Sequence, residues 1–188
     1  MNWLQEAFLE PTMVQAVIII SLVSALGLYL GRIKIFGISL GITFVFFAGI
    51  FAGHLGIVVN KDMLYFAQSF GLILFVYALG LQVGPGFFSS LKKGGVVMNM
   101  MGLGVILLGL IMTVSLHWVT GVSLSNMVGL LCGAVTNTPA LGAAQQALLQ
   151  IDPANTKGVT DMALACAVAY PLGVVGVILA IIIPVSYT

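Results

Sequence analysis

Long apolar runs, separated by short polar segments, form the dominant pattern of the chain. Five of these runs are long enough for a membrane-crossing helix, because about 20 apolar residues are needed to span the hydrocarbon core. They cover residues 12–30, 37–57, 63–83, 96–118 and 162–183. We therefore predict five transmembrane helices within a single transmembrane domain, residues 1–188.

The segment between the fourth and fifth runs, residues 124–150, is interrupted by Thr136-Asn137-Thr138-Pro139. Proline removes a backbone donor and turns the preceding residue away from helical angles. Irregular backbone at membrane depth is tolerated only where protein buries it or where it lines a cavity. The flanking stretches, 127–135 and 140–149, would each be about 14 Å long as helices, or half the core. A re-entrant helical hairpin with its tip at the break fits this length, and so does a broken helix that crosses.

The composition of the chain indicates a membrane environment. Hydrophobic residues make up 61% of it and charged residues 6%, with a mean hydropathy of +1.20, whereas a soluble domain carries roughly 25% charged residues. Lipid is therefore its expected partner, and a net charge of +1 gives no reason to expect nucleic acid. Cys132 and Cys166 lack metal-type or disulfide-type spacing, so we expect them to be small buried residues. The expected class is an all-α polytopic membrane protein.

The few cations orient the predicted spans. Arg32 and Lys34 follow the first span, and Lys92 and Lys93 follow the third. Cytoplasmic loops carry an excess of Lys and Arg, so these loops are expected in the cytoplasm and the N-terminus outside. A re-entrant hairpin then places the C-terminus in the cytoplasm, and a crossing broken helix places it outside.

The break supplies the first candidate binding site. Thr138 precedes Pro139, which suits a first helical position, so Thr138 is the expected N-cap of the following helix. A helix start favours a carboxylate, and the Asn137 amide and the threonine hydroxyls add neutral hydrogen-bonding groups. The substrate-binding candidates are Thr136, Asn137, Thr138, Pro139 and Ala140. The alternative is a proline kink whose threonines bond within their own helix.

Two further motifs contain candidates. Gly84-Pro85-Gly86 is expected to end the third helix, and Gln82 lies just before it. Tyr170 precedes Pro171, which should kink the fifth span, and a buried tyrosine hydroxyl needs a partner. Asp161 is expected at the start of that span. No catalytic His, Cys or carboxylate cluster and no phosphate loop occurs in the sequence, so we expect neither an enzyme nor a cofactor or metal site.

Three stretches carry a family resemblance: Gly71–Phe88, Gly133–Leu141 and Ala169–Gly173. Together they resemble the aspartate:alanine exchanger family of bacterial membrane transporters, and the resemblance covers nearly the whole chain. It implies the first membrane half of an inverted-repeat secondary transporter in the bacterial inner membrane, paired with a second inverted half or an oligomeric partner. It also implies cytoplasmic regulatory domains after this half, which favours the re-entrant hairpin and a cytoplasmic C-terminus.

Three functions follow from these observations. The resemblance implies antiport of small carboxylates, either amino acids such as aspartate and alanine or dicarboxylates, by alternating access with substrate at the hairpin tip. The second possibility is a non-transporting membrane assembly or regulatory subunit, in which the break serves helix packing. The third is a cation-coupled antiporter with a crossing broken helix, which would place Asn155 and Lys157 in the cytoplasm.

Overall fold

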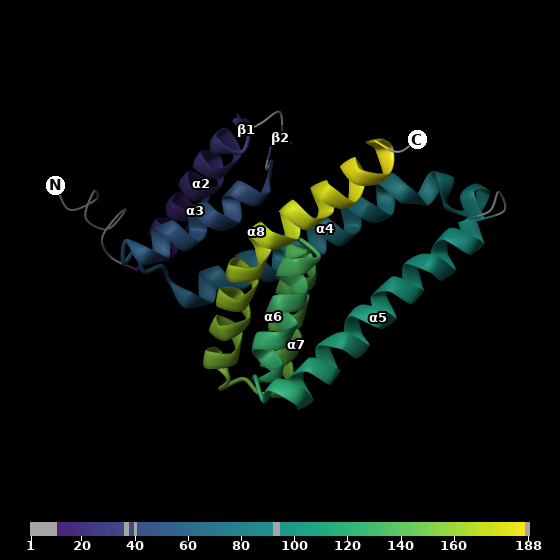
Figure 1. The fold of residues 1–188 in the computed structure, drawn as a ribbon. Coiled ribbons are helices and arrows are strands. Elements are labelled where there is room, and N and C mark those ends of the chain that lie inside the picture. Colours follow the sequence, from purple (N-terminus) through teal and green to yellow (C-terminus); the bar gives the residue numbers. More distant parts are fainter. Residues whose placement is uncertain (1–10, 36–37, 40, 92–94, 187–188) are drawn as a thin grey trace. The chain divides into compact units, whose positions relative to one another are not determined.

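The computed structural model describes residues 11–35, 38–39, 41–91 and 95–186. The chain divides into two units, residues 1–70 and 71–188, each built mainly from helices (Figure 1). Lys92 and Lys93, which contribute to the predicted orientation, lie outside the described residues.

The first unit contains a pair of packed helices. Helix α2, Met13–Leu30, confirms the first predicted helix and begins after Thr12, whose side chain accepts a hydrogen bond from the Gln15 N–H at 3.1 Å. It packs against α3, Thr43–His54, so closely that a Cβ on Gly27 would overlap the backbone of Val45. Between these helices, β1, Lys34–Ile35, pairs antiparallel with β2, Ile38–Ser39. The all-helical prediction did not include this short ladder.

Helix α3 is shorter than the predicted second span, residues 37–57. Its 12 residues give a length of about 18 Å, whereas the hydrocarbon core is about 30 Å thick. Glycines in left-handed conformation flank it: Gly41 has a φ of 54° and Gly56 a φ of 78°. Because the left-handed conformation interrupts helical hydrogen bonding and glycine adopts it readily, the apolar run extends further than the helix.

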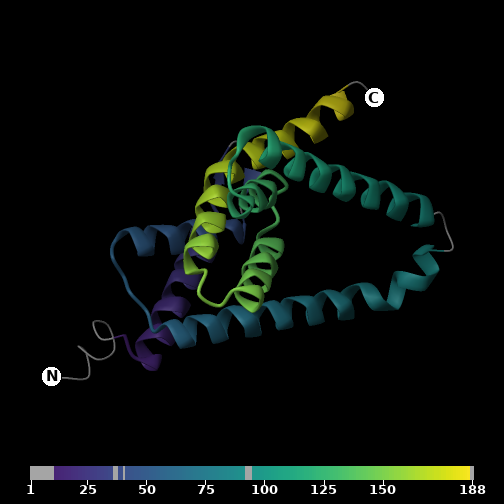
Figure 2. The ribbon, with the colours of Figure 1, turned by 90° about the horizontal axis from the view of Figure 1, so that it is seen from below.

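Helix α4, Lys61–Ser90, is longer than the predicted third span. It begins after Asn60, whose Oδ1 accepts a hydrogen bond from the Met63 N–H at 3.0 Å. Pro85 lies inside this helix, so the prediction that Gly84-Pro85-Gly86 ends it is wrong. Proline removes one helical hydrogen bond, but its fixed φ lies in the helical range. A helix can therefore continue past a proline with a bend. Figure 2 shows α4 changing direction near its C-terminal end.

The boundary between the units lies inside α4, and the second unit contains residues 71–90 of that helix and four further helices: α5, Val96–Thr120; α6, Leu124–Ala134; α7, Thr138–Ile151; and α8, Thr156–Ser186. Helices α5 and α8 cover the predicted fourth and fifth spans. Because α8 begins at Thr156, Asp161 lies in its second turn and not at its start. In the described part of the chain, α2, α4, α5 and α8 are long and apolar enough to cross a membrane.

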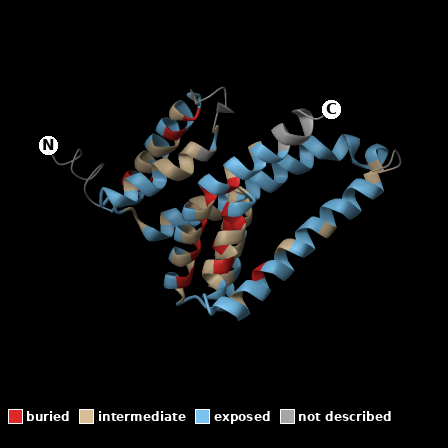
Figure 3. Cartoon of the chain, viewed as in Figure 1, coloured by how far each residue is buried: buried red, intermediate tan, exposed pale blue. Residues whose placement is uncertain are grey.

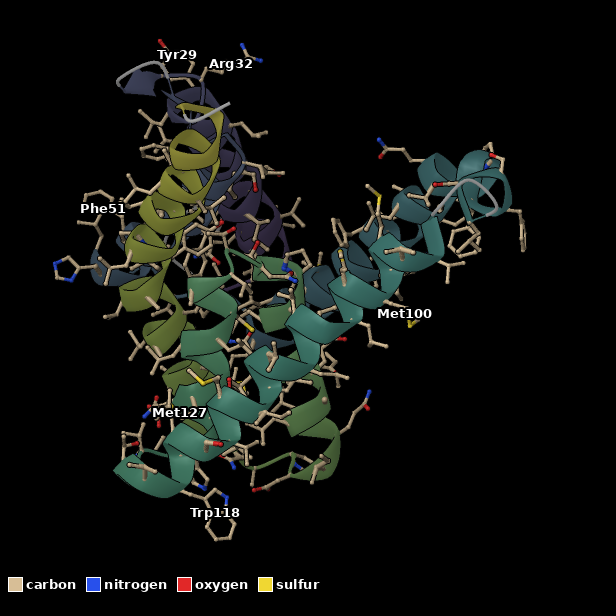
Figure 4. The ribbon with its side chains drawn as sticks, turned by 45° about the vertical axis from the view of Figure 1, so that its right-hand side comes forward. Tyr29, Arg32, Phe51, Met100, Trp118 and Met127 are labelled. Atoms are coloured by element: carbon tan, nitrogen blue, oxygen red, sulfur yellow. The ribbon has the colours of Figure 1, made fainter. Side chains whose placement is uncertain are left out.

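The core of the second unit lies between α6 and α8, which make its most extensive packing contact. Cys132 and Cys166 are buried there as free thiols, as predicted for small core residues. Within this unit, Figure 3 shows most of the buried positions on α6 and α8, with α5 exposed along most of its length. In Figure 4, Met127 of α6 lies among neighbouring side chains, whereas Trp118, 81% exposed, points away from the end of α5.

Candidate functional site

Helix α6 lies parallel to α8 with the two backbones nearly in contact. A Cβ on Gly129 would overlap the Met162 carbonyl, and a Cβ on Gly133 would overlap the Cys166 carbonyl. Residue numbers thus rise together along the two helices. Glycine at these positions permits a close approach, as small residues do at helix interfaces in membranes.

Helix α7 runs back in the opposite direction. The Gln145 side chain donates from Nε2 to the Val159 carbonyl at 2.9 Å. A Cβ on Gly158 would lie 2.8 Å from Leu148 Cδ2 and 3.1 Å from Ser125 Oγ. The start of α6 and the end of α7 therefore meet at the start of α8, and α6 and α7 form a helical hairpin (Figure 1).

The tip of this hairpin, Val135–Asn137, lies beside the middle of α8. A Cβ on Gly173 would overlap the carbonyls of Gly133 and Ala134. Gly173 lies 15 positions after Gly158 in α8, which corresponds to about 22 Å along the helix. Figure 1 shows α8 bending about halfway along its length; Pro171 supplies the reason, as predicted, because it removes a helical hydrogen bond.

A Schellman motif closes α6 at the tip. The Thr136 N–H donates to the Gly133 carbonyl at 3.0 Å, and the Asn137 N–H donates to the Cys132 carbonyl at 2.8 Å. The motif places one residue in left-handed conformation, usually glycine. Here that residue is Thr136, with a φ of 54°. A β-branched residue in this conformation is strained, by about 1–3 kcal/mol.

Asn137, and not Thr138, caps the start of α7. Its Oδ1 accepts a hydrogen bond from the Ala140 N–H at 3.0 Å, and its backbone carbonyl accepts from the Leu141 N–H at 3.3 Å. The prediction that Thr138 is the N-cap is therefore wrong by one residue: Thr138 is the first residue of the helix and Pro139 the second. Proline is tolerated at both positions, since neither N–H would have a helical partner.

The Thr138 N–H has no protein acceptor within the described residues. The Asn137 side chain is exposed and the Thr138 side chain partly exposed. The start of α7 therefore presents a backbone N–H, a hydroxyl and the Nδ2 of an amide in one place. All three can donate hydrogen bonds.

Tyr170 contacts the tip from α8. Its side chain is 4% exposed, and its hydroxyl donates to the Thr136 carbonyl at 3.4 Å. The structure thus brings Tyr170 together with residues of the break. Gln82, in contrast, is exposed on α4, and none of the tip contacts described above involves it.

A hollow of about 420 Å³ lies next to the tip. Small and aliphatic residues of α8, together with the last residue of α6, line it: Ala134, Ala169, Leu172, Gly173, Gly176, Val177 and Ala180. Sequence analysis singled out the stretches that contain Ala134, Ala169, Leu172 and Gly173 but assigned none of these four residues to a site. It gave no signal for Gly176, Val177 and Ala180 beyond the apolar pattern of the last span.

Nothing in the described part of the chain groups three or more His, Cys, Asp or Glu side chains that could hold a metal ion. The tip instead combines hydroxyl, amide and backbone groups. Its chemistry is therefore suited to neutral hydrogen bonding of a ligand.

The family model Asp-Al_Ex, described as Predicted Permease Membrane Region, matches residues 19–186. The chain belongs to this family. It is 60% identical over 183 residues to an "Uncharacterized transporter" of Bacteroides thetaiotaomicron, and 59% identical over 179 residues to one of Porphyromonas gingivalis. These matches cover 97% and 95% of the chain and 32% of each relative. No solved structure matches.

A more distant relative in Enterobacter sp. strain 638 is named as a transport protein and is 47% identical over 165 residues, covering 86% of the chain and 30% of that relative. The chain thus spans about a third of the length of the curated relatives it matches. Family membership and the long apolar helices together identify a membrane-embedded protein of the permease class.

Proposed function

We propose that this chain forms one membrane half of a secondary transporter for small carboxylates, and that the substrate binds at the tip of the α6–α7 hairpin. The substrate class is amino acids such as aspartate and alanine, or dicarboxylates. The membrane is the bacterial inner membrane. The transport names of the relatives and the permease family support transport in general.

The observation that supports a carboxylate substrate is the set of hydrogen-bond donors at the start of α7. A carboxylate has two oxygens, and the Thr138 N–H, the Thr138 hydroxyl and the Asn137 Nδ2 are available to both. The partial positive charge of a helix start favours an anion there. Binding without a buried lysine or arginine avoids the cost of placing a bare charge at membrane depth when no substrate is present.

The course of the hairpin supports re-entry from one side of the membrane. Both ends of the hairpin lie at the start of α8, and its tip lies about 22 Å further along that helix, well inside a core about 30 Å thick. With the N-terminus outside and the C-terminus in the cytoplasm, the hairpin enters from outside. Alternating access then moves the hairpin and the first half of α8 as one body, because their backbones are in close contact.

The second half of the proposed transporter is an inverted membrane half or an oligomeric partner. Relatives about three times as long as this chain leave room for such a half. In the described residues, the α4 and α5 side chains are almost all exposed and largely apolar, including Phe75, Leu107 and Met112. Lipid and a partner half are the surroundings that suit them.

Ligand-dependent thermal stabilisation tests this proposal. A carboxylate that binds only the folded state raises the unfolding midpoint, by an amount corresponding to about 2.7 kcal/mol at one hundred times its Kd. We expect aspartate or a dicarboxylate to raise the midpoint in detergent, and the corresponding diamide, which has no carboxylate, to leave it unchanged. No shift with any amino acid or dicarboxylate would reject the substrate class.

A non-transporting assembly subunit is the second candidate. The close backbone contacts at Gly129, Gly133 and Gly173 also favour it, because they would serve helix packing alone. A midpoint that does not respond to carboxylates, in a protein that folds and associates normally, would support it. The cation-coupled antiporter with a crossing helix receives less support, since α6 and α7 run in opposite directions.

A further inference from the structure

Thr136 is the one non-glycine residue with a positive φ in the described part of the chain. The other left-handed positions there are Gly41, Gly56 and Gly121, and Gly121 caps the end of α5. The chain thus uses glycine at each of these turns except at the hairpin tip. A β-branched residue there requires surrounding contacts that hold the backbone in place.

The contact that holds the backbone of Thr136 comes from the Tyr170 side chain of α8. Tyr170 lies on the same face of α8 as Cys166 and Gly173, one turn away from each. These two residues contact the end of α6 at Gly133. The Tyr170 hydroxyl donates to the Thr136 carbonyl, the carbonyl of the strained residue itself. The contact joins residues 34 positions apart in the sequence.

The orientation of this carbonyl decides where the tip donors point. The Thr136 carbonyl and the Asn137 N–H belong to one rigid peptide plane, and that N–H closes the Schellman motif at Cys132. If Thr136 left the left-handed conformation, the plane would rotate and carry the Asn137 cap with it. The α7 start would then present its donors in another direction.

We propose that Tyr170 is a positioning residue: its hydroxyl holds Thr136 in the left-handed conformation and so sets the direction of the donors at the start of α7. This role rests on the proposed function of the tip, but its physical content is a coupling between Tyr170 and Thr136. In this role Tyr170 acts through the backbone of Thr136; the direct contact with substrate that the sequence predicts for it stays a prediction.

Amide hydrogen exchange at the hairpin tip tests the coupling between Tyr170 and Thr136, and it requires no added label. In the whole chain in detergent, Tyr170→Phe keeps the ring and removes the hydroxyl. We expect exchange of the Thr136 and Asn137 amides to become about threefold to tenfold faster, the factor that one net hydrogen bond contributes to an equilibrium. Exchange of the Asp152 and Asn155 amides, at the other end of the hairpin, should not change.

Two controls separate positioning from general destabilisation. Tyr77→Phe, at a side chain 64% exposed on α4, should leave tip exchange unchanged. Thr136→Gly removes the strain, so adding it to Tyr170→Phe should restore slow exchange at the tip, because glycine adopts the left-handed conformation readily. If Thr136→Gly does not slow tip exchange in Tyr170→Phe, or if Tyr170→Phe accelerates exchange at both ends of the hairpin, the proposal is wrong.

Two further results are decisive by themselves. Should Tyr170→Phe alone not fold, faster tip exchange in Thr136→Gly/Tyr170→Phe than in Thr136→Gly supports the proposal, because glycine keeps the carbonyl that the hydroxyl bonds, and equal exchange overturns it. Aspartate added to the unsubstituted chain tests the substrate class separately. Tip exchange that aspartate does not slow would count against the proposed function, while the dependence on Thr136 would still support the coupling.

Discussion

Gly129 lies against the backbone of Met162, with no space for a side chain between the two helices. Gly133 and Cys166 repeat this contact one turn further on. Because backbone atoms cannot move aside as a flexible side chain can, these contacts fix the separation of α6 and α8. The hairpin and the first half of α8 therefore form one packed body.

Gly129→Ala should destabilise this body. We expect the free energy of unfolding to fall by about 1–3 kcal/mol, the usual cost of overpacking a closely packed site. Gly102→Ala on α5 is the matched control, because nothing lies within 4 Å of a Cβ there. It should be neutral or stabilising by about 0.5–1 kcal/mol, since alanine replaces glycine inside a helix. Unfolding midpoints in detergent measure both variants, and equal effects would contradict the close contact.

Thr136→Gly should raise stability, whereas Thr138→Gly should lower it. At position 136 glycine relieves left-handed strain, and we expect a gain of about 1 kcal/mol. Thr138 has helical angles, so glycine there should cost up to about 1 kcal/mol. Thermal unfolding of the two variants provides the measurement. A loss of stability in both would show that the Thr136 side chain contributes more than its backbone conformation costs.

Substitutions at Asn137 separate capping from substrate binding. Serine and aspartate both cap helices well, so Asn137→Ser and Asn137→Asp should fold with near-normal stability. A carboxylate at position 137 would repel a bound carboxylate by about 4 kcal/mol at 4 Å and an effective dielectric constant of 20. We therefore expect Asn137→Asp to weaken aspartate binding by about tenfold or more. Asn137→Ser should bind more tightly than Asn137→Asp; equal affinities would place the substrate elsewhere.

Cysteine labelling in intact cells tests the course of the hairpin. Ser123 precedes α6 and Ala154 follows α7, and both are exposed. An impermeant thiol reagent should therefore label Ser123→Cys and Ala154→Cys from the same side. Ser90→Cys, before α5, should be protected from that reagent, because α5 is about 37 Å long and crosses the core between them. Labelling of Ser123→Cys and Ala154→Cys from opposite sides would require a crossing broken helix.

The apolar runs alone predict most of the helices. The helices predicted near residues 12–30, 96–118 and 162–183 are confirmed by α2, α5 and α8. Long apolar runs in lipid must satisfy their backbone groups internally, which favours a helix. Helix ends are less predictable. Pro85 does not end α4, and glycines in left-handed conformation make α3 shorter than its apolar run.

The break at Thr136-Asn137-Thr138-Pro139 is also predicted from sequence, because a proline preceded by three small polar residues that favour caps and turns disfavours a continuous helix there. The positions of its groups are not. The cap falls on Asn137, Thr136 takes the left-handed position, and Tyr170 contacts the Thr136 carbonyl from 34 residues away. Local propensity determines that the helix stops; the packing of α6 against α8 decides how the chain turns, because contacts distant in sequence stabilise a strained conformation that local preferences disfavour.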